Sequence, residues 1–172
     1  MKKIALAFCA IWSLQAADHD LYRHSVEAVG SYAFNSDDMD LKDEWGWGLR
    51  YNYNCSTVNP WEVGAYQFAF DYQFNSDYIG GGSSSVYRFG ANALWYADNP
   101  SDLTPFAMLG FGAQFFSDEE HGTGDGLFGT IGAGVEYQFR GDFALVGEGK
   151  YLYGGDESSL LTTIGFKYSF GQ

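Results

Sequence analysis

Eight charged side chains lie within segments whose other residues are mainly apolar, small or amidic. Four are acidic and four are basic: Glu27, Asp71, Glu136, Glu148, Arg50, Arg88, Lys150 and Lys167. An unpaired charge in a low-dielectric interior is costly, whereas opposite charges in equal number can neutralise one another. The pattern therefore predicts a buried charge network, and these eight residues form the candidate functional site.

Two acidic runs, at residues 37–40 and 118–120, could offer carboxylate oxygens to Ca²⁺ or Mg²⁺. Neither run has the glycine and glutamate spacing of an EF-hand loop. The segment from Gly124 to Gly129 matches the G-x-G-x-x-G pattern, but a strand pattern follows it where a phosphate-binding helix is required. We therefore expect no cofactor, no metal site and, at most, weak binding of divalent cations by solvated loops.

Three histidines are candidate bases for a hydrolase. A serine, a histidine and an acid must be held together by rigid elements for such chemistry. His19 and His24 belong to the N-terminal approach to the first patterned segment, and His121 lies in a glycine-rich loop without an evident serine partner. We therefore expect no enzymatic activity.

Alternation of bulky apolar residues with small or polar residues predicts the elements that position these side chains. In one segment, for example, Trp47, Leu49 and Tyr51 alternate with Gly48 and Arg50. Eight segments share the pattern: 25–34, 45–54, 63–74, 86–96, 105–116, 127–139, 143–153 and 160–170. Their connections alternate between acidic, Ser- and Gly-rich segments and turns containing Asn59-Pro60, Asn99-Pro100 or Gly141. The chain is therefore predicted to be all-β with eight strands.

The two faces of these strands favour a membrane barrel over a soluble sandwich. One face is bulky, aromatic and almost uncharged, as lipid contact requires, while the other holds small and polar residues with the eight charges. We expect a transmembrane eight-stranded antiparallel up-and-down β-barrel, whose lumen is nearly free of large apolar groups. Its aromatic girdles are predicted to be Tyr51, Tyr53, Phe139, Tyr168 and Phe170 at the periplasmic interface, and Phe34, Trp45, Tyr72, Phe74 and Tyr153 at the outer one.

The overall charge also restricts function. A net charge of -13 and a pI near 4.3 argue against binding to nucleic acid, whose phosphates repel an acidic surface. Most of the surplus acids lie in the longer connections, where Lys42 is the single base. We therefore expect an acidic rim and an electrically balanced lumen.

The N-terminal residues have the layout of a secretory signal peptide. Lys2 and Lys3 precede an apolar stretch from residue 4 to residue 14, and Ala16-Ala17 offers a small-residue cleavage site. We expect residues 1–17 to be removed, leaving residues 18–172 as one barrel domain. Cys55 would then be the single cysteine, so no intramolecular disulfide is expected.

Three short motifs add a family resemblance to this pattern. The motifs are the C-terminal Tyr168-Ser169-Phe170-Gly171-Gln172, the segment Gly134-Val135-Glu136-Tyr137 and the turn Val58-Asn59-Pro60. They resemble parts of OmpA-type eight-stranded outer-membrane β-barrels. The resemblance implies integral location in the outer membrane of a Gram-negative bacterium, with extracellular loops and periplasmic termini. Full-length members carry a further peptidoglycan-binding domain after a linker, which we do not assume for this chain.

The resemblance also implies a narrow, mostly closed pore, because lumenal salt bridges form a proposed gate in that family. Arg88 and Glu136 match the family's basic residue on strand four and its acid on strand six. Gln67 stands where the gate acid of strand three is expected, and Glu148 stands where strand seven usually carries arginine. We therefore expect a rearranged network that includes Arg50, Arg88, Glu136, Glu148 and Lys150.

These expectations describe a porin-like structural protein of the cell envelope. Its expected partners are outer-membrane lipids, lipopolysaccharide and the outer-membrane assembly machinery, which would recognise the C-terminal strand through Phe166, Tyr168 and Phe170. The barrel is expected to be a monomer. The alternative is a surface binding module, an adhesin or receptor, acting through the acidic loops with Trp45, Tyr78 and Met39 as candidate anchors.

Overall fold

Eight long strands and the residues next to them make up the part of the chain that the computed structural model describes, residues 23–35, 42–55, 62–77, 82–97, 101–117, 126–154 and 157–171. The strands are β1 (His24–Asn35), β2 (Glu44–Asn54), β3 (Ala65–Asp77), β4 (Ser83–Tyr96), β5 (Leu103–Phe116), β6 (Gly126–Arg140), β7 (Phe143–Gly154) and β8 (Glu157–Phe170). Each overlaps one predicted segment. The signal-peptide residues, both acidic runs, His19, His121, Met39 and Tyr78 lie outside the described residues.

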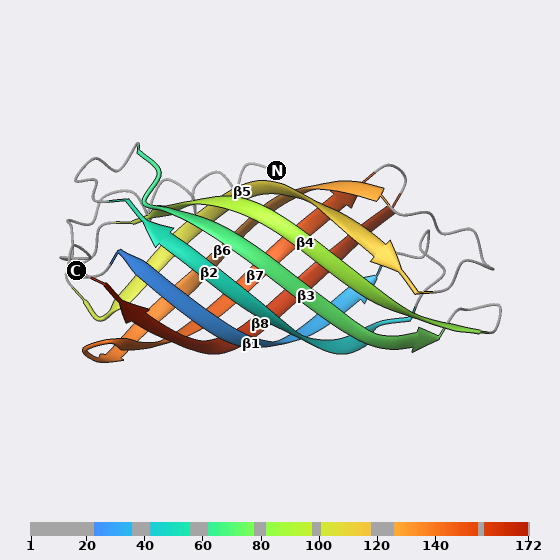
Figure 1. The fold of residues 1–172 in the computed structure, drawn as a ribbon, viewed down its shortest axis with the longest axis horizontal. Helices are drawn as coiled ribbons and strands as arrows, with labels where there is room; N and C mark the ends of the chain where they lie inside the picture. Colours follow the sequence, from blue (N-terminus) through green and yellow to red (C-terminus); the bar gives the residue numbers. More distant parts are fainter. Residues whose placement is uncertain are drawn as a thin grey trace, which may run out of the picture.

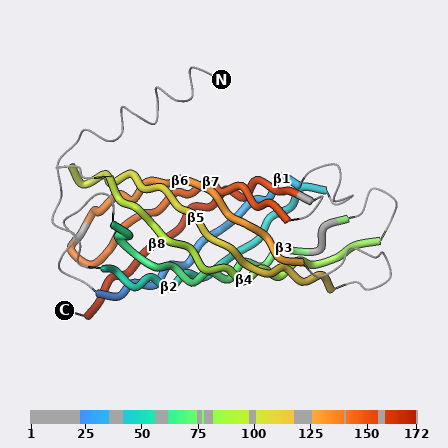
Figure 2. The backbone as a smooth tube through the Cα atoms, turned by 90° about the horizontal axis from the view of Figure 1, so that it is seen from above, coloured from blue at the N-terminus to red at the C-terminus, as the bar shows by residue number. Residues whose placement is uncertain are grey.

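The strands form a closed barrel in which every strand pairs antiparallel with its neighbours in sequence, and β1 pairs with β8 (Figure 1). Closure satisfies the strand edges internally, which a lipid environment demands. Figure 2 shows the strands running obliquely around one long tube. The predicted eight-stranded up-and-down barrel is confirmed.

The barrel has two ends, which we name by their connections. The terminal end holds the beginning of β1, the end of β8 and the strand ends that the chain connects from β2 to β3, from β4 to β5 and from β6 to β7. The loop end holds the other four connections. At the terminal end the turn between β6 and β7 contains Gly141, whose positive φ of 40° suits glycine. His24 begins β1 there, so its assignment to the approach before the first strand was wrong.

The bulky face points outward, as predicted. Exposed fractions of Phe68, Phe111 and Ile164 are 58%, 71% and 70%. The eight charged residues of the candidate site all face inward and are buried. Within the described residues, no helix is long and apolar enough to cross a membrane.

The lumen differs from the prediction, because it contains large apolar side chains. Two buried clusters lie inside the barrel: the terminal-end cluster of Ala65, Leu94, Phe106, Met108 and Val146, and the loop-end cluster of Ala33, Phe128, Leu152 and Leu161. The expectation of a lumen nearly free of such groups was wrong. The physical reason is that glycines on neighbouring strands leave room for large inward side chains, so a glycine-rich face need not be an open one.

Candidate functional site

Asp71 is the centre of the charge network. Its Oδ1 lies 2.6 Å from Arg50 Nη2, and its Oδ2 lies 3.0 Å from Lys150 Nζ. The side chains of all three are at most 6% exposed. Arg50 comes from the adjacent strand β2, whereas Lys150 comes from β7, four strands away around the barrel. The Asp71–Lys150 ion pair therefore crosses the lumen.

Glu148 extends this layer to further strands. Its Oε2 lies 3.8 Å from Arg50 Nε and accepts a hydrogen bond of 3.1 Å from the Thr163 hydroxyl. Gln67 donates to Glu148 Oε1 at 3.3 Å, and Asn92 donates to Gln67 at 2.9 Å. Five strands, β2, β3, β4, β7 and β8, thus contribute to one layer of polar contacts across the lumen. We call this layer, centred on Asp71, the charge layer or the Asp71 network.

A second group lies toward the terminal end. Lys167 on β8 pairs with Glu136 on β6, with Nζ 2.7 Å from Oε2, and its ammonium lies 5.7 Å from the centre of the Tyr96 ring. Glu27 on β1 has Arg50 and Lys167 as register neighbours on its two sides and accepts a hydrogen bond from Asn52. The carboxylates here are therefore close to cationic or amide groups.

Arg88 completes the predicted set. Its Nη1 donates to Gln73 Oε1 at 2.8 Å, and Asp71 is its register partner on β3. All eight predicted site residues are thus buried on the lumenal face, and six of them join the ion pairs above, namely Arg50, Asp71, Glu136, Glu148, Lys150 and Lys167. The two groups are arranged to neutralise charge inside the tube.

Neutral polar residues of the network were missed as site members by sequence reasoning. Asn52, Gln73, Asn92 and Thr163 each contact a charged residue or its amide partner. For Asn52, Gln73 and Thr163 the available signal is an inward-facing position next to a charged residue on the same strand or the paired strand. Asn92 lacks this signal, because its register partners are Gln67 and Gly110. Among the neutral polar residues of the network, only Gln67 was recognisable from the sequence, because it departs from the family pattern.

The other motifs carry no catalytic arrangement within the described residues. No group of three or more metal-ligating side chains occurs there. His24 Nδ1 lies 2.8 Å from the Tyr51 hydroxyl, and its ring stacks against Phe170. Gly126 to Gly129 belong to β6, so a strand follows the start of the G-x-G-x-x-G pattern, as expected. Cys55 is a free thiol near the terminal end, and partial burial raises its pKa.

Residues 4–170 match the family model described as the outer membrane protein beta-barrel domain. The chain belongs to this family. It is therefore an integral β-barrel protein of the bacterial outer membrane, as the OmpA-type resemblance implied. A comparison with curated proteins finds no match.

Solved outer-membrane barrels share the fold at low sequence identity. Neisserial surface protein A is 18% identical, with a TM-score of 0.64 over 86% of this chain and 97% of that one. The N-terminal barrel of Pseudomonas aeruginosa OprF is 17% identical, with a TM-score of 0.56 over 86% and 96%. The outer membrane enzyme PagL is 12% identical, with a TM-score of 0.53 over 84% and 99%. The shared fold therefore does not decide between structural and enzymatic roles.

Membership in this family explains the outward aromatic bands. At the terminal end, Tyr168 packs against Phe143 and Phe170, with ring centroids 5.1 and 6.0 Å apart. At the loop end, Tyr32 packs against Phe34 and Trp45, at 4.8 and 4.9 Å. Aromatic girdles of this kind mark the two interfaces of outer-membrane barrels.

The tight fit of the charge layer makes Gly48 a sensitive position. A Cβ at Gly48 would lie 2.5 Å from Asp71 Oδ1 and 2.7 Å from Arg50 Nη1. We expect Gly48→Ala to lower the free energy of unfolding by about 1–3 kcal/mol through overpacking. Urea unfolding in lipid vesicles, followed by tryptophan fluorescence, measures this change.

Gly149 supplies the matched control, because a Cβ there would meet nothing within 4 Å. Gly149→Ala is expected to change stability by no more than about 0.5 kcal/mol, since it adds no clash and lowers the entropy of the unfolded chain. Equal losses for the two variants would contradict a tightly fitted Arg50–Asp71 pair.

Proposed function

We propose that this protein is a structural component of the outer membrane whose lumen is closed at rest and conducts only rarely, as a narrow pore. The observation that carries this proposal is the Asp71–Lys150 ion pair, which crosses the lumen between β3 and β7. Eight strands leave an interior just wide enough for side chains to fill. The layer around Asp71 fills it with neutralised charges.

The proposed orientation places the longer, acidic connections of the loop end outside the cell and the terminal end in the periplasm. Short periplasmic turns and longer extracellular loops are the general rule for bacterial barrels. In this orientation the aromatic outer surface contacts phospholipid and lipopolysaccharide. Phe166, Tyr168 and Phe170, which are exposed on β8, would be available to the assembly machinery. The proposed unit is a monomer.

The proposal predicts rare and small conductance. If opening requires separation of one buried ion pair at about 3 kcal/mol, the open state is populated below about 1% of the time. Planar bilayer recordings of the purified protein should therefore show brief, small openings above a closed baseline. Large steady steps, of the kind given by trimeric porins, would contradict the proposal.

The proposal assigns no catalytic activity, although PagL shows that a similar barrel can be an enzyme. In support, His24 contacts Tyr51 and aromatic rings at the membrane-facing surface, which is not the setting of a serine hydrolase base. The purified protein should leave lipid A and phospholipids unchanged in a mass-spectrometric assay. Detection of deacylated or palmitoylated lipid would overturn this part of the proposal.

The alternative of a surface binding module depends mainly on loop residues outside the described part of the chain. Trp45, an anchor candidate that is described, is 63% exposed at the start of β2. A variant with shortened loops separates the two functions, because it should retain the conductance of the barrel. Loss of attachment to host surfaces or phage with unchanged conductance would favour the binding module.

A further inference from the structure

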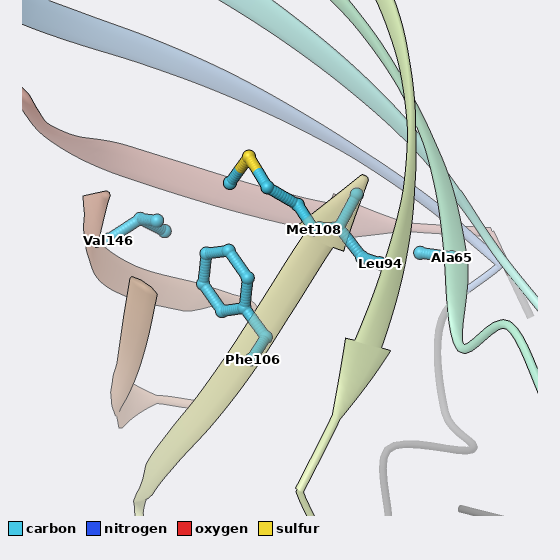
Figure 3. Packing of buried hydrophobic residues seen from close by; sticks show 5 residues of the cluster. All are labelled: Ala65, Leu94, Phe106, Met108 and Val146. Carbon is cyan, nitrogen blue, oxygen red and sulfur yellow. The ribbon is translucent and has the colours of Figure 1, made fainter. Parts of the chain in front are cut away.

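The terminal-end cluster forms an apolar layer inside the barrel. Phe106 and Met108 come from β5, Leu94 from β4, Ala65 from β3 and Val146 from β7, and each is at most 5% exposed. Figure 3 shows the Phe106 ring and Met108 in the lumen, between Leu94 and Ala65 on one wall and Val146 on another. Tyr96 packs against this cluster. The layer thus extends across the tube from β3 to β7.

The loop-end cluster forms a second apolar layer. It joins Ala33 on β1 to Phe128 on β6, Leu152 on β7 and Leu161 on β8. The Phe128 ring also reaches toward β4, where its Cζ lies 3.9 Å from the position of a Cβ on Gly90. Since β1, β4 and β6 are not neighbours, this layer also crosses the lumen.

The charge layer lies between the two apolar layers. The order of inward residues along β7 shows this directly: Val146 of the terminal-end cluster, then Glu148 and Lys150, then Leu152 of the loop-end cluster. An ion that moves toward the Asp71–Lys150 pair from either end therefore passes one of the two apolar clusters on its way. Apolar constrictions exclude water and ions by dewetting.

The phenylalanine ring of each layer packs over a glycine of the paired strand. Phe106 is the register partner of Gly134, and Phe128 is the register partner of Gly112. A Cβ on Gly134 would lie 2.9 Å from Phe106 Cε1, and one on Gly112 would lie 2.9 Å from Phe128 Cε2. Reciprocal Phe–Gly pairs on β5 and β6 therefore hold one ring in each layer.

We infer that the barrier to ions in this barrel consists of the two apolar layers, with Phe106 and Phe128 as its determining residues, and that separation of the lumenal ion pairs alone does not open the tube. This inference rests on the proposed closed barrel and names what closes it. It assigns exclusion of hydrated ions to apolar side chains, and it leaves neutralisation of the buried charges to the Asp71 network.

A cysteine reporter on the inward side of Phe128 along β6 tests this without requiring conductance. Thr130 is buried on the lumenal face of β6, two residues from Phe128. In the full protein in lipid vesicles, with Cys55→Ser to remove the native thiol, Thr130→Cys is treated with a cationic methanethiosulfonate reagent. Ser101→Cys, at an exposed turn, serves as the accessible control.

Three backgrounds are compared: the native lumen, Asp71→Asn and the double variant Phe106→Ala with Phe128→Ala. Since dewetting depends on the apolar constriction, we expect the Thr130→Cys reaction to be at least about tenfold faster in the double variant. It should remain slow in the native lumen and in Asp71→Asn. Replacement of both phenylalanines by leucine, which keeps the layers apolar, should retain the slow reaction.

Heat-modifiable gel mobility identifies folded protein, and only that fraction is scored. If the double variant does not fold, Phe106→Ala and Phe128→Ala are tested singly, and each should accelerate the reaction from one side of the vesicle. Fast labelling in the native lumen or in Asp71→Asn, or slow labelling in the folded Phe106→Ala and Phe128→Ala variants, would overturn the inference. Frequent native conductance with slow labelling would instead contradict the proposed function.

Discussion

Asp71→Asn is expected to lower the free energy of unfolding by about 3–5 kcal/mol, because it leaves buried cations without their counter-charge. Lys150 loses the carboxylate it pairs with at 3.0 Å, and Arg50 retains only the longer 3.8 Å contact with Glu148. Both cations are buried, so solvent cannot replace the lost carboxylate. Equilibrium unfolding in urea in phospholipid vesicles, followed by tryptophan fluorescence, measures the loss.

The Lys42–Asp77 pair provides a matched control for this experiment. It has an Nζ–Oδ2 distance of 3.4 Å, and its side chains are 62% and 65% exposed. Asp77→Asn is expected to cost about 0–1 kcal/mol, since solvent screens an exposed pair. A similar loss for both variants would contradict the assignment of Asp71 to a buried, low-dielectric network.

Ile164→Arg is expected to lower stability by about 2–4 kcal/mol, because it places a charge on the lipid-facing surface near the middle of a strand. Ile164 is 70% exposed and lies midway along β8. The effect should appear in the same vesicle assay as a shift of the unfolding midpoint to lower urea concentration.

Leu127→Arg is the control, because Leu127 is 80% exposed but lies at the loop end of β6. Near the interface the cost of arginine falls to about 0–1 kcal/mol. The ratio of the two losses therefore reports depth in the membrane. Two negligible losses would contradict contact of the outer face with hydrocarbon.

The lumenal glycines explain why one part of the interior was predicted wrongly. Phe106, Met108 and Phe128 occupy the same alternating positions as glycines and polar residues. Most residues at these positions are therefore small or polar when each segment is read alone. Opposite Phe106 and Phe128 the paired strand carries a glycine, and the space it leaves is filled by the ring. Register, which no single segment reveals, decides whether a glycine-rich face is open or occupied.

The partners of the candidate site also required the tertiary structure. Parity alone predicted that Glu27, Arg50 and Lys150 face inward, because alternation of side chains is a local property of an extended backbone. It did not predict that Lys150 meets Asp71, 79 residues earlier in the chain. That contact depends on closure of the sheet, which places β3 opposite β7.

Alternation along the chain was enough to predict the number of strands, the face that each strand presents to lipid, and the set of charges that lies inside. Those properties follow from the two-residue period of a strand and from the cost of exposing a strand edge or a charge to hydrocarbon. The pairing of the charges and the position of the apolar parts of the lumen became known from the folded barrel. Both depend on distances across the barrel, which are fixed by the strand register and by the volumes of side chains that meet from distant strands.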